Sequence, residues 1–270
     1  MTGAQAGPLE VIQAPRLKEC PTVRHAFFTR LGGVSEGPYA SLNGGSSTGG
    51  DTPERIAENR RRAAEFLGLD PTRLLRVRQV HGTRTVTVTE PWGIEGPPEA
   101  DALVTRSPGL GLMILTADCA PVLLADPTAG IVGAAHAGWR GALAGILESV
   151  LEAMEHLGAH RTRILAAIGP CIAQNSYEVG PEVREAFVHQ APSSERFFRP
   201  SLNTEGRSLF DLPGYVAARL SAAGVTAVDP SSADTYADER RFFSYRRTTL
   251  RGESDRGNLM SAMMLNPEGC

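Results

Sequence analysis

Short apolar runs and amphipathic segments alternate along most of this 270-residue chain. The clearest amphipathic segment spans 141–157, where apolar side chains recur every three or four positions and Gly158 follows as a stop signal. Because strand-like and helix-like segments are interspersed, the pattern predicts an α/β fold, a mixed layered sandwich. Further helices are expected at 52–67, 181–190 and 211–224, and strands at 26–29, 75–80, 85–89, 112–116, 122–125, 131–135, 164–168 and 242–245.

The chain shows no internal repeat and no convincing linker between domains. Two stretches rich in glycine with serine or proline, 32–50 and 91–99, are predicted to be loops, since neither is long or polar enough to separate two folded units. We therefore expect an N-terminal extension over 1–20 and a single catalytic domain over 21–270.

Charge and composition exclude several classes of protein. Acidic residues number 30 and basic residues 27, a net charge of −3, whereas a general nucleic-acid binder usually carries a basic excess. The first residues lack the basic start and apolar stretch of a signal peptide, and no apolar run approaches the ~18–20 residues that span a bilayer. The four cysteines are too few for a disulfide scaffold. We expect a soluble, cytoplasmic protein without nucleic-acid or membrane partners.

Three of the strand-like runs end beside a histidine or a cysteine, namely His81, Cys119 and His136. The ends of sheet strands are where α/β proteins usually gather their site residues. Two histidines and one cysteine match a catalytic zinc site, which uses three protein ligands and leaves a fourth position for water or substrate. The spacing matches no local zinc motif, so buried structural roles for the same side chains stay open at this point.

Eight short motifs follow one another along most of the chain: HAFFTRLGGVS at 25–35, SLN at 41–43, QVHG at 79–82, TADCAPV at 116–122, HAGWRG at 136–141, IGPCI at 168–172, YEV at 177–179 and FFSYRR at 242–247. Together, and in this order, they resemble the "multicopper polyphenol oxidase/laccase-domain" family. Members of that family are described as zinc-dependent purine nucleoside phosphorylases with adenosine deaminase activity, and some are linked to peptidoglycan editing.

The resemblance implies a single-domain αββα sandwich. By motif, it implies that the zinc ligands are His81, Cys119 and His136, which the strand ends select independently. The implied reaction converts adenosine, inosine or methylthioadenosine and phosphate into a free base and ribose 1-phosphate, and adenosine is also deaminated. The implied partners are therefore a small nucleoside and phosphate, and the implied cofactor is Zn²⁺, with copper in vitro left open.

Phosphorolysis needs a group that holds phosphate, and arginine binds phosphate in a bidentate geometry. The substrate-binding candidates in the matched motifs are Arg30, Arg140, Arg246 and Arg247. Arg30 is also placed with the metal ligands as a catalytic candidate, because N–H groups near Gly32 and Gly33 can form an anion-binding nest beside it. Each arginine could instead face solvent. Asn43, a further substrate-binding candidate, could instead be a residue that shapes its own loop.

Other positions in the motifs leave their roles open. Asp118 either orients a ligand or ends its strand, Glu178 is an acid/base group or a salt-bridge partner, and Cys171 is expected to be structural or pocket-lining. The chain also departs from the family at Asp234, where members commonly have cysteine, and at Asn258, where they often have arginine. Any substrate contact of that arginine is not carried over.

Other functions compete with the phosphorylase. A multicopper oxidase needs roughly ten histidines and a cysteine to hold four coppers, so the six histidines of this chain disfavour a polyphenol oxidase. A Cys–His amide hydrolase acting in peptidoglycan precursor editing, with Cys119 as nucleophile and His81 or His136 as base, remains an alternative. A non-catalytic binding module is not favoured, since the sequence shows no large surplus of aromatic or charged residues. We expect a monomer or a weak homodimer.

Overall fold

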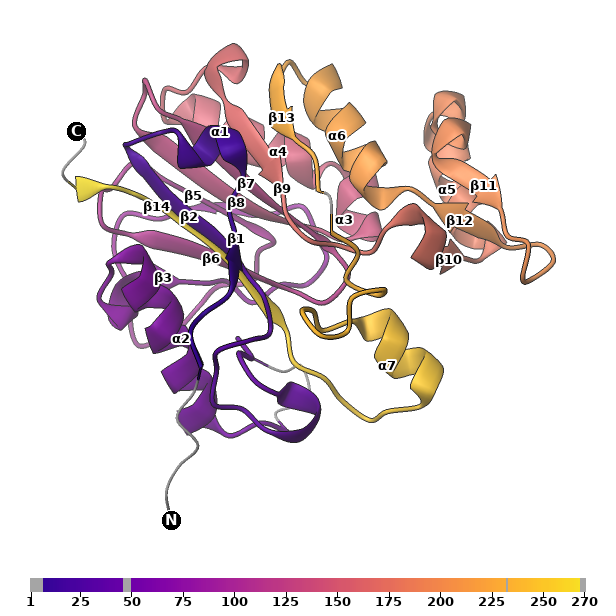
Figure 1. Ribbon diagram of the computed structural model, residues 1–270. Coiled ribbons are helices and arrows are strands. Elements are labelled where there is room, and N and C mark those ends of the chain that lie inside the picture. The colour runs from indigo at the N-terminus through magenta and orange to yellow at the C-terminus, as the bar shows by residue number, and fades with distance from the viewer. Residues whose placement is uncertain (1–6, 46–49, 232, 268–270) are drawn as a thin grey trace.

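Two mixed β-sheets pack against each other at the centre of the protein (Figure 1). The computed structural model describes residues 7–45, 50–231 and 233–267. The five-stranded sheet has the order β1-β2-β14-β6-β3, formed by Val11–Ile12, Val23–Phe28, Leu259–Leu265, Gly111–Thr116 and Leu74–Leu75. The six-stranded sheet has the order β13-β9-β7-β8-β5-β4, formed by Ala227–Asp229, Leu165–Ile168, Ala120–Asp126, Ile131–Ala137, Ala102–Thr105 and Thr85–Thr87.

A layer of helices covers the outer face of each sheet (Figure 1). Helix α2 (Pro53–Leu67) packs on the five-stranded sheet in one buried cluster with Phe28 and Met260. Helices α4 (Ile146–His156) and α6 (Leu212–Ala222) bury their apolar faces against the six-stranded sheet. The layers therefore follow helix, sheet, sheet, helix, and the expected α/β sandwich is confirmed.

The helix expected over 141–157 is interrupted, so that prediction is wrong at its N-terminal end. The structure has α3 (Trp139–Ala144) followed by α4, and Gly145 between them is left-handed, with φ 107°. Glycine adopts this conformation without the steric penalty of a Cβ, so it ends one helix and begins the next. The break separates the turn that carries Trp139 and Arg140 from the buried helix α4.

The other predicted helices are confirmed. Helix α2 begins after Thr52, whose hydroxyl accepts a hydrogen bond from the N–H of Arg55, and it ends at the left-handed Gly68. Asp211 caps α6 in the same way by accepting from the N–H of Gly214. The remaining helical elements are α5 (Pro181–Gln190), as predicted, α1 (Pro15–Lys18), α7 (Tyr245–Arg251) and 3-10 turns at Gly37–Tyr39, Pro71–Arg73, Arg161–Arg163, Gln174–Ser176 and Pro192–Phe197.

The strand expected over 242–245 is wrong. Ser244 instead caps α7 by accepting a hydrogen bond from the N–H of Arg247, while Phe242 and Phe243 are buried in the preceding loop. Of the run expected over 75–80, only the first residue lies in a sheet, as part of β3. The other expected strands are present with shifted ends, and the pattern did not predict β1, β5, β13, β14 or the small sheet described next.

A small antiparallel sheet, β10-β12-β11, lies with α5 beside the main layers (Figure 1). Its strands are Glu178–Val179, Ser208–Phe210 and Phe198–Pro200. Phe187 of α5 is fully buried, with its ring centroid 4.7 Å from those of both Phe210 and Tyr215. The same ring lies 6.5 Å from Trp139, so this aromatic cluster supports the start of α3.

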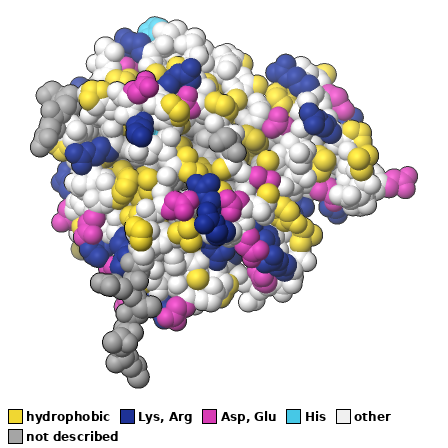
Figure 2. Space-filling model, viewed as in Figure 1, with side chains coloured by type: hydrophobic (Ala, Val, Ile, Leu, Met, Phe, Trp, Pro, Cys, Tyr) yellow, Lys and Arg dark blue, Asp and Glu magenta, His cyan; other side chains and the backbone are white. Residues whose placement is uncertain are grey.

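The N-terminal segment also packs on the sheets. Strand β1 pairs antiparallel with β2, and Leu17 of α1 is fully buried. On the face shown in Figure 2, basic and acidic side chains are interspersed. Many arginines pair with carboxylates, as Arg61 does with Glu58. Among the described helices, none has the length and apolar character required to cross a membrane.

Candidate metal centre

His81, Cys119 and His136 converge where the chain crosses from β6 of one sheet to β7 of the other. Their potential ligand atoms all lie within 4.8 Å of one another, and Sγ of Cys119 lies 4.0 Å from Nε2 of His81. The two imidazole centroids are 4.7 Å apart. Exposure falls from His81, which faces solvent, through Cys119 to the buried His136. The three side chains that the sequence predicted as a group therefore meet at one point.

Strand pairing places two members of this His–Cys–His cluster side by side. Strands β7 and β8 are antiparallel with Pro121 opposite His136, so Cys119, just before β7, lies beside that histidine. Gly138 follows β8, and a Cβ on it would lie 3.0 Å from both Sγ of Cys119 and Cδ2 of His81. Glycine at this position therefore leaves room for the cluster to close.

A buried carboxylate, that of Asp101, holds both histidines. It accepts the N–H groups of Val80, His81 and Gly82 at 3.2, 2.9 and 2.7 Å, which stabilises the left-handed backbone of His81 at φ 61°. The same carboxylate lies 2.8 Å from Nδ1 of His136. A histidine bound in this way through Nδ1 presents Nε2 as its ligand atom, an arrangement typical of metal-ligating histidines.

Charge at the cluster is set by competing effects. Burial alone would raise the pKa of the Cys119 thiol, but His136 and His81 outweigh burial and lower it to about 6. Burial alone would lower the pKa of His136, but Cys119 and Asp101 raise it to about 9. Thiolate is the form of cysteine that binds metals, so the surroundings prepare Cys119 as a ligand, whereas His136 has to release a proton when a metal binds. By contrast, burial raises the pKa of the Cys171 thiol, as expected for a structural cysteine.

The donor set fits zinc. Imidazole nitrogen and thiolate are ligand types that zinc takes, three protein ligands leave one coordination position open, and Asp101 completes the carboxylate–histidine arrangement around them. Within the described ranges, no other group of three histidine, cysteine or acidic side chains comes as close together. The described part of the chain therefore offers one metal centre of this kind.

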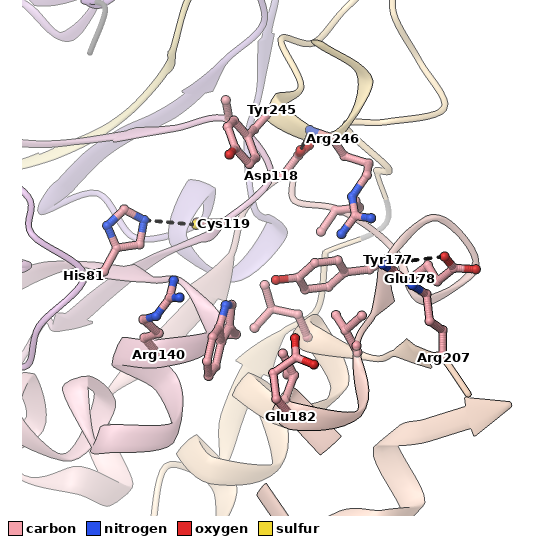
Figure 3. A pocket seen from close by; sticks show the side chains of 17 residues that line it. His81, Asp118, Cys119, Arg140, Tyr177, Glu178, Glu182, Arg207, Tyr245 and Arg246 are labelled. Atoms are coloured by element: carbon pink, nitrogen blue, oxygen red, sulfur yellow. Dashed lines mark hydrogen bonds and ion pairs between the residues drawn. The ribbon is translucent and has the colours of Figure 1, made fainter. Parts of the chain in front are cut away.

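A cavity of about 340 Å³ opens beside the cluster (Figure 3). We call it the aromatic cavity, because its wall includes three aromatic side chains as well as the cluster: Trp139, Tyr177, Tyr245, His81 and Cys119. Figure 3 shows the phenol of Tyr177 pointing into this space, with Arg140 and Arg246 on different sides of it. Its size and mixed wall suit a small organic ligand.

Two of the four predicted arginines line the aromatic cavity. The guanidinium of Arg140 lies 4.4 Å from the ring centroid of Trp139, and that of Arg246 lies 5.5 Å from the ring centroid of Tyr177. Stacking of this kind is favourable and holds the aromatic ring and the charge in a fixed relation. Both arginines are therefore placed to contact a ligand held against the rings.

The structure places Arg30 and Arg247 elsewhere. Arg247 is buried and donates to the carbonyl oxygens of Tyr236 at 2.8 Å, Thr235 at 3.0 Å and Phe242 at 2.5 Å. Arg30 donates from Nε to the carbonyl oxygen of Ala40 at 2.6 Å and lies over the ring of Phe243 at 4.3 Å. The two line a separate cavity that does not include the His–Cys–His cluster.

Asn43 is buried and contacts its own loop region. Its Nδ2 donates to Asp51 at 2.8 Å, while Oδ1 accepts from the N–H groups of Gly45 and Asn258. It lines neither the aromatic cavity nor the second cavity beside the cluster, which is described below. These contacts favour the alternative that Asn43 shapes its own loop. The same contacts place Asn258, where the family often has arginine, next to this loop.

Asp118 and Glu178 have different surroundings. Asp118 is buried with φ 89° and accepts hydrogen bonds from the hydroxyls of Thr235 and Ser244 and from the N–H of Arg246. It thereby ties the turn before Cys119 to α7. Glu178 lies in the wall of the aromatic cavity but accepts from the hydroxyl of Ser201 at 2.6 Å, which favours a structural role.

A second cavity of about 470 Å³ meets the first at His81, Ala117 and Cys119. We call it the arginine cavity, because four arginines line it: Arg60, Arg76, Arg78 and Arg256. His136 lines only this second cavity. The cluster therefore stands between an aromatic space and a strongly basic one.

A family model described as "Multi-copper polyphenol oxidoreductase laccase" matches residues 24–266. The chain belongs to this family. The laccase family name refers to several coppers, whereas the described residues bring together one His–Cys–His group.

Curated relatives carry a different name. "Purine nucleoside phosphorylase ORF3" of Streptomyces griseus is 45% identical over 228 residues, which cover 84% of this chain and 90% of that protein. "Purine nucleoside phosphorylase" of Deinococcus radiodurans is also 45% identical, over 240 residues that cover 88% of each chain. These relatives support a nucleoside-processing enzyme for this member of the laccase family.

Solved structures of similar proteins share the fold. Neisseria meningitidis protein NMB0706 superposes with a TM-score of 0.82 at 33% identity, covering 96% of this chain and 99% of that one. Bacillus licheniformis protein YfiH gives a TM-score of 0.84 at 30% identity, covering 97% of each chain. The αββα layers expected from the resemblance to the laccase family are therefore shared by both structures.

Sequence reasoning missed the residue that organises the centre. Asp101 directly precedes β5, a short apolar run that pairs with β8. The available signal was an acidic residue immediately before the first residue of such a run. Sequence reasoning also did not select Arg60, Arg76 or Arg256, because none stands in a matched motif and the chain is rich in arginine throughout, and Arg256 could not be assumed to replace the family arginine at position 258.

Proposed function

We propose that this protein is a zinc-dependent purine nucleoside phosphorylase that also deaminates adenosine. The observation that carries the proposal is that His81 and Cys119 of the His–Cys–His cluster line an aromatic cavity large enough for a nucleoside. Purine rings stack on aromatic side chains, and each such contact is worth ~1–3 kcal/mol for bases bound by proteins. The curated relatives named purine nucleoside phosphorylase support the same reaction class.

His81, Cys119 and His136 would hold the zinc ion. Bound there, zinc would supply a Lewis acid and activate water at neutral pH. Asp101 keeps Nδ1 of His136 occupied, and the lowered pKa of Cys119 keeps its thiol ionised, so the ligands are prepared for the metal.

The chain's other residues would bind the nucleoside. Trp139, Tyr177 and Tyr245 provide flat surfaces for the purine, and Arg140 and Arg246 keep two of these rings oriented. These arginines also place positive charge where the polar edge of the nucleoside would lie. The cavity wall excludes part of the solvent, which strengthens every polar contact within it.

The phosphorolysis step is a substitution at the anomeric carbon. A bond forms between an oxygen of hydrogen phosphate and C1′, and the C1′–N9 bond breaks with its electron pair moving to the base. The proton that hydrogen phosphate gives up accounts for the proton that the base gains. Deamination is a separate reaction, in which water replaces the amino group at C6 and ammonia leaves.

The test measures metal content and products together. Purified protein is analysed for zinc and copper, then incubated with adenosine, inosine or methylthioadenosine, with and without phosphate. We expect the protein to contain zinc. Free base should form only when phosphate is present, together with ribose 1-phosphate from adenosine or inosine and 5-methylthioribose 1-phosphate from methylthioadenosine. Inosine should form from adenosine with or without phosphate. The absence of both ribose 1-phosphate and inosine in zinc-loaded protein would contradict the proposal.

A second candidate is a Cys–His amide hydrolase acting on peptidoglycan precursors. It is favoured by one observation, the alignment of Cys119, His136 and Asp101, which matches the order of a nucleophile, a base and an orienting carboxylate. A chelator separates the two functions. It would abolish phosphorolysis, whereas a thiol hydrolase would continue to cleave precursors and would be stopped by iodoacetamide.

A further inference from the structure

The wall of the arginine cavity is built for negative charge. Four arginines line it, and no aspartate or glutamate does. Arg78 pairs with Glu99 at 2.9 Å. Within the described part of the chain, Arg60, Arg76 and Arg256 make no ion pair with a carboxylate. This contrasts with arginines such as Arg61, which pairs with Glu58, and leaves three positive charges in the wall of one space.

These arginines are partly removed from water, and two of them contact neutral groups: Arg60 donates to the carbonyl oxygen of Gly44 at 2.8 Å, and Arg256 lies over the ring of Tyr245 at 4.5 Å. Burial lowers the pKa of Arg60 to about 10, and the nearby Arg76 adds to that effect. Burial also lowers the pKa of Arg76, and that of Arg256 even though Asp118 and Asp255 lie near it. A bound anion would relieve this repulsion and desolvation together.

Unpaired polar atoms point to the same cavity. Among buried side-chain atoms in the described residues, three have no hydrogen-bond partner, namely Oγ1 of Thr116, Nε of Arg256 and, away from this cavity, Oε2 of Glu148. Thr116 and Arg256 both belong to the wall of the arginine cavity. Buried polar groups in native proteins are nearly always paired, so the polar contacts within this wall are incomplete, although both atoms are themselves covered by neighbouring atoms.

The aromatic cavity is less suited to an anion. Its three arginines, Arg140, Arg207 and Arg246, share the wall with an equal number of acidic residues, Asp118, Glu178 and Glu182. A dianion there would approach carboxylates at close range, whereas no carboxylate lines the arginine cavity.

We propose that the arginine cavity is the phosphate subsite, with Arg60, Arg76 and Arg256 as its ligands, and that phosphate and nucleoside occupy the two cavities on either side of the cluster. This assignment rests on the proposed phosphorylase function. Because the cavities meet at His81 and Cys119, a phosphate oxygen and the anomeric carbon can come together there.

The test has a binding arm and a kinetic arm. Inorganic phosphate is titrated into metal-stripped protein and followed by calorimetry, and the KM for phosphate is measured in the zinc-loaded protein. For Arg76→Gln and Arg60→Gln we expect phosphate binding at least about tenfold weaker and a phosphate KM raised to match, with nucleoside KM changed by less than about twofold. Arg106→Gln is the matched control, since Arg106 is exposed and lines neither cavity.

The outcomes distinguish a failure of the phosphate subsite from a failure of the proposed phosphorylase reaction. Arg76→Lys keeps the charge and the folded state, and we expect it to recover part of the phosphate binding. Wild-type protein that binds no phosphate, or folded glutamine variants that bind it as wild type does, would overturn the subsite. Phosphate binding that is lost in the variants, without ribose 1-phosphate from wild type, would support the subsite and overturn the phosphorylase.

Discussion

Oδ1 of Asp101 lies 2.8 Å from Nδ1 of His136, and the same buried carboxylate accepts the N–H groups of His81 and Gly82. One side chain therefore fixes the ring of one predicted zinc ligand and the backbone of another. The two histidines come from different parts of the chain, so their convergence depends on this carboxylate as well as on the sheets.

Replacing this carboxylate should weaken metal binding. For Asp101→Asn we expect zinc affinity to fall about 10–100-fold, because His136 loses a charged partner that fixes its orientation. Competition with a chromophoric chelator measures the affinity. Asp70→Asn, at an exposed helix cap, is the control and should bind zinc as wild type does. Equal affinity in the two variants would mean that Asp101 does not support the centre.

His25 should make stability depend on pH. Its Nε2 accepts the N–H of Ala14 at 2.8 Å, and burial lowers its pKa to about 4, with Asp229 opposing the shift. Between pH 6.5 and 4 the unfolded chain takes up a proton that the folded chain does not. This contribution is therefore fully present above pH 6.5 and is lost as the pH falls, by up to about 3 kcal/mol.

Urea unfolding of wild type and His25→Gln at pH 7, 6 and 5 measures this contribution. We expect the free energy of unfolding to fall more steeply in wild type than in the variant over that range. Parallel pH profiles for the two proteins would show that His25 titrates normally in the folded state.

The arginines predicted from the sequence should differ in effect: replacing Arg247 should lower stability, and replacing Arg140 should weaken nucleoside binding. Arg247→Ala removes the donor to three buried carbonyl groups, so we expect the free energy of unfolding to fall by on the order of 3 kcal/mol. Arg140→Ala should change it by less than about 0.5 kcal/mol, because Arg140 is exposed. Instead it should raise the nucleoside KM about two- to fivefold through the loss of its stacking on Trp139. The opposite pattern would place the ligand near Arg247.

The aromatic cluster under α3 should be important for stability. Phe187 is fully buried among Phe198, Phe210 and Tyr215, and Phe187→Ala should lower the free energy of unfolding by about 3–5 kcal/mol. His189→Ala, exposed on the same helix, should change it by less than about 0.5 kcal/mol. Thermal or urea unfolding compares them, and a small loss for Phe187→Ala would mean that α5 is not anchored by this ring.

The layers and the cluster could be predicted from the sequence for physical reasons. Apolar periodicity marks α4 because its buried face repeats at helical spacing, and His81, Cys119 and His136 stand beside apolar runs. Strand β14 was missed because it is buried on both faces, so its residues do not alternate. The strand predicted over 242–245 was wrong because apolar side chains also fill buried loops, as Phe242 and Phe243 do.

The site could be predicted only in part. Arg30 and Arg140 look alike in sequence, and only the tertiary contacts show that one donates to loop carbonyls while the other lines the aromatic cavity. Asp101 reaches His136 through the pairing of β5 with β8, a long-range contact that no local pattern specifies.

The most direct measurement compares zinc content and ribose 1-phosphate formation in wild type, Cys119→Ala and Cys20→Ala. Cys20 is a buried cysteine outside the cluster and both cavities, so its variant controls for the loss of a thiol. We expect about one zinc per chain and phosphate-dependent product from wild type and Cys20→Ala, with both lost in Cys119→Ala. A folded Cys119→Ala protein with full zinc content and full activity would contradict the assignment of this centre.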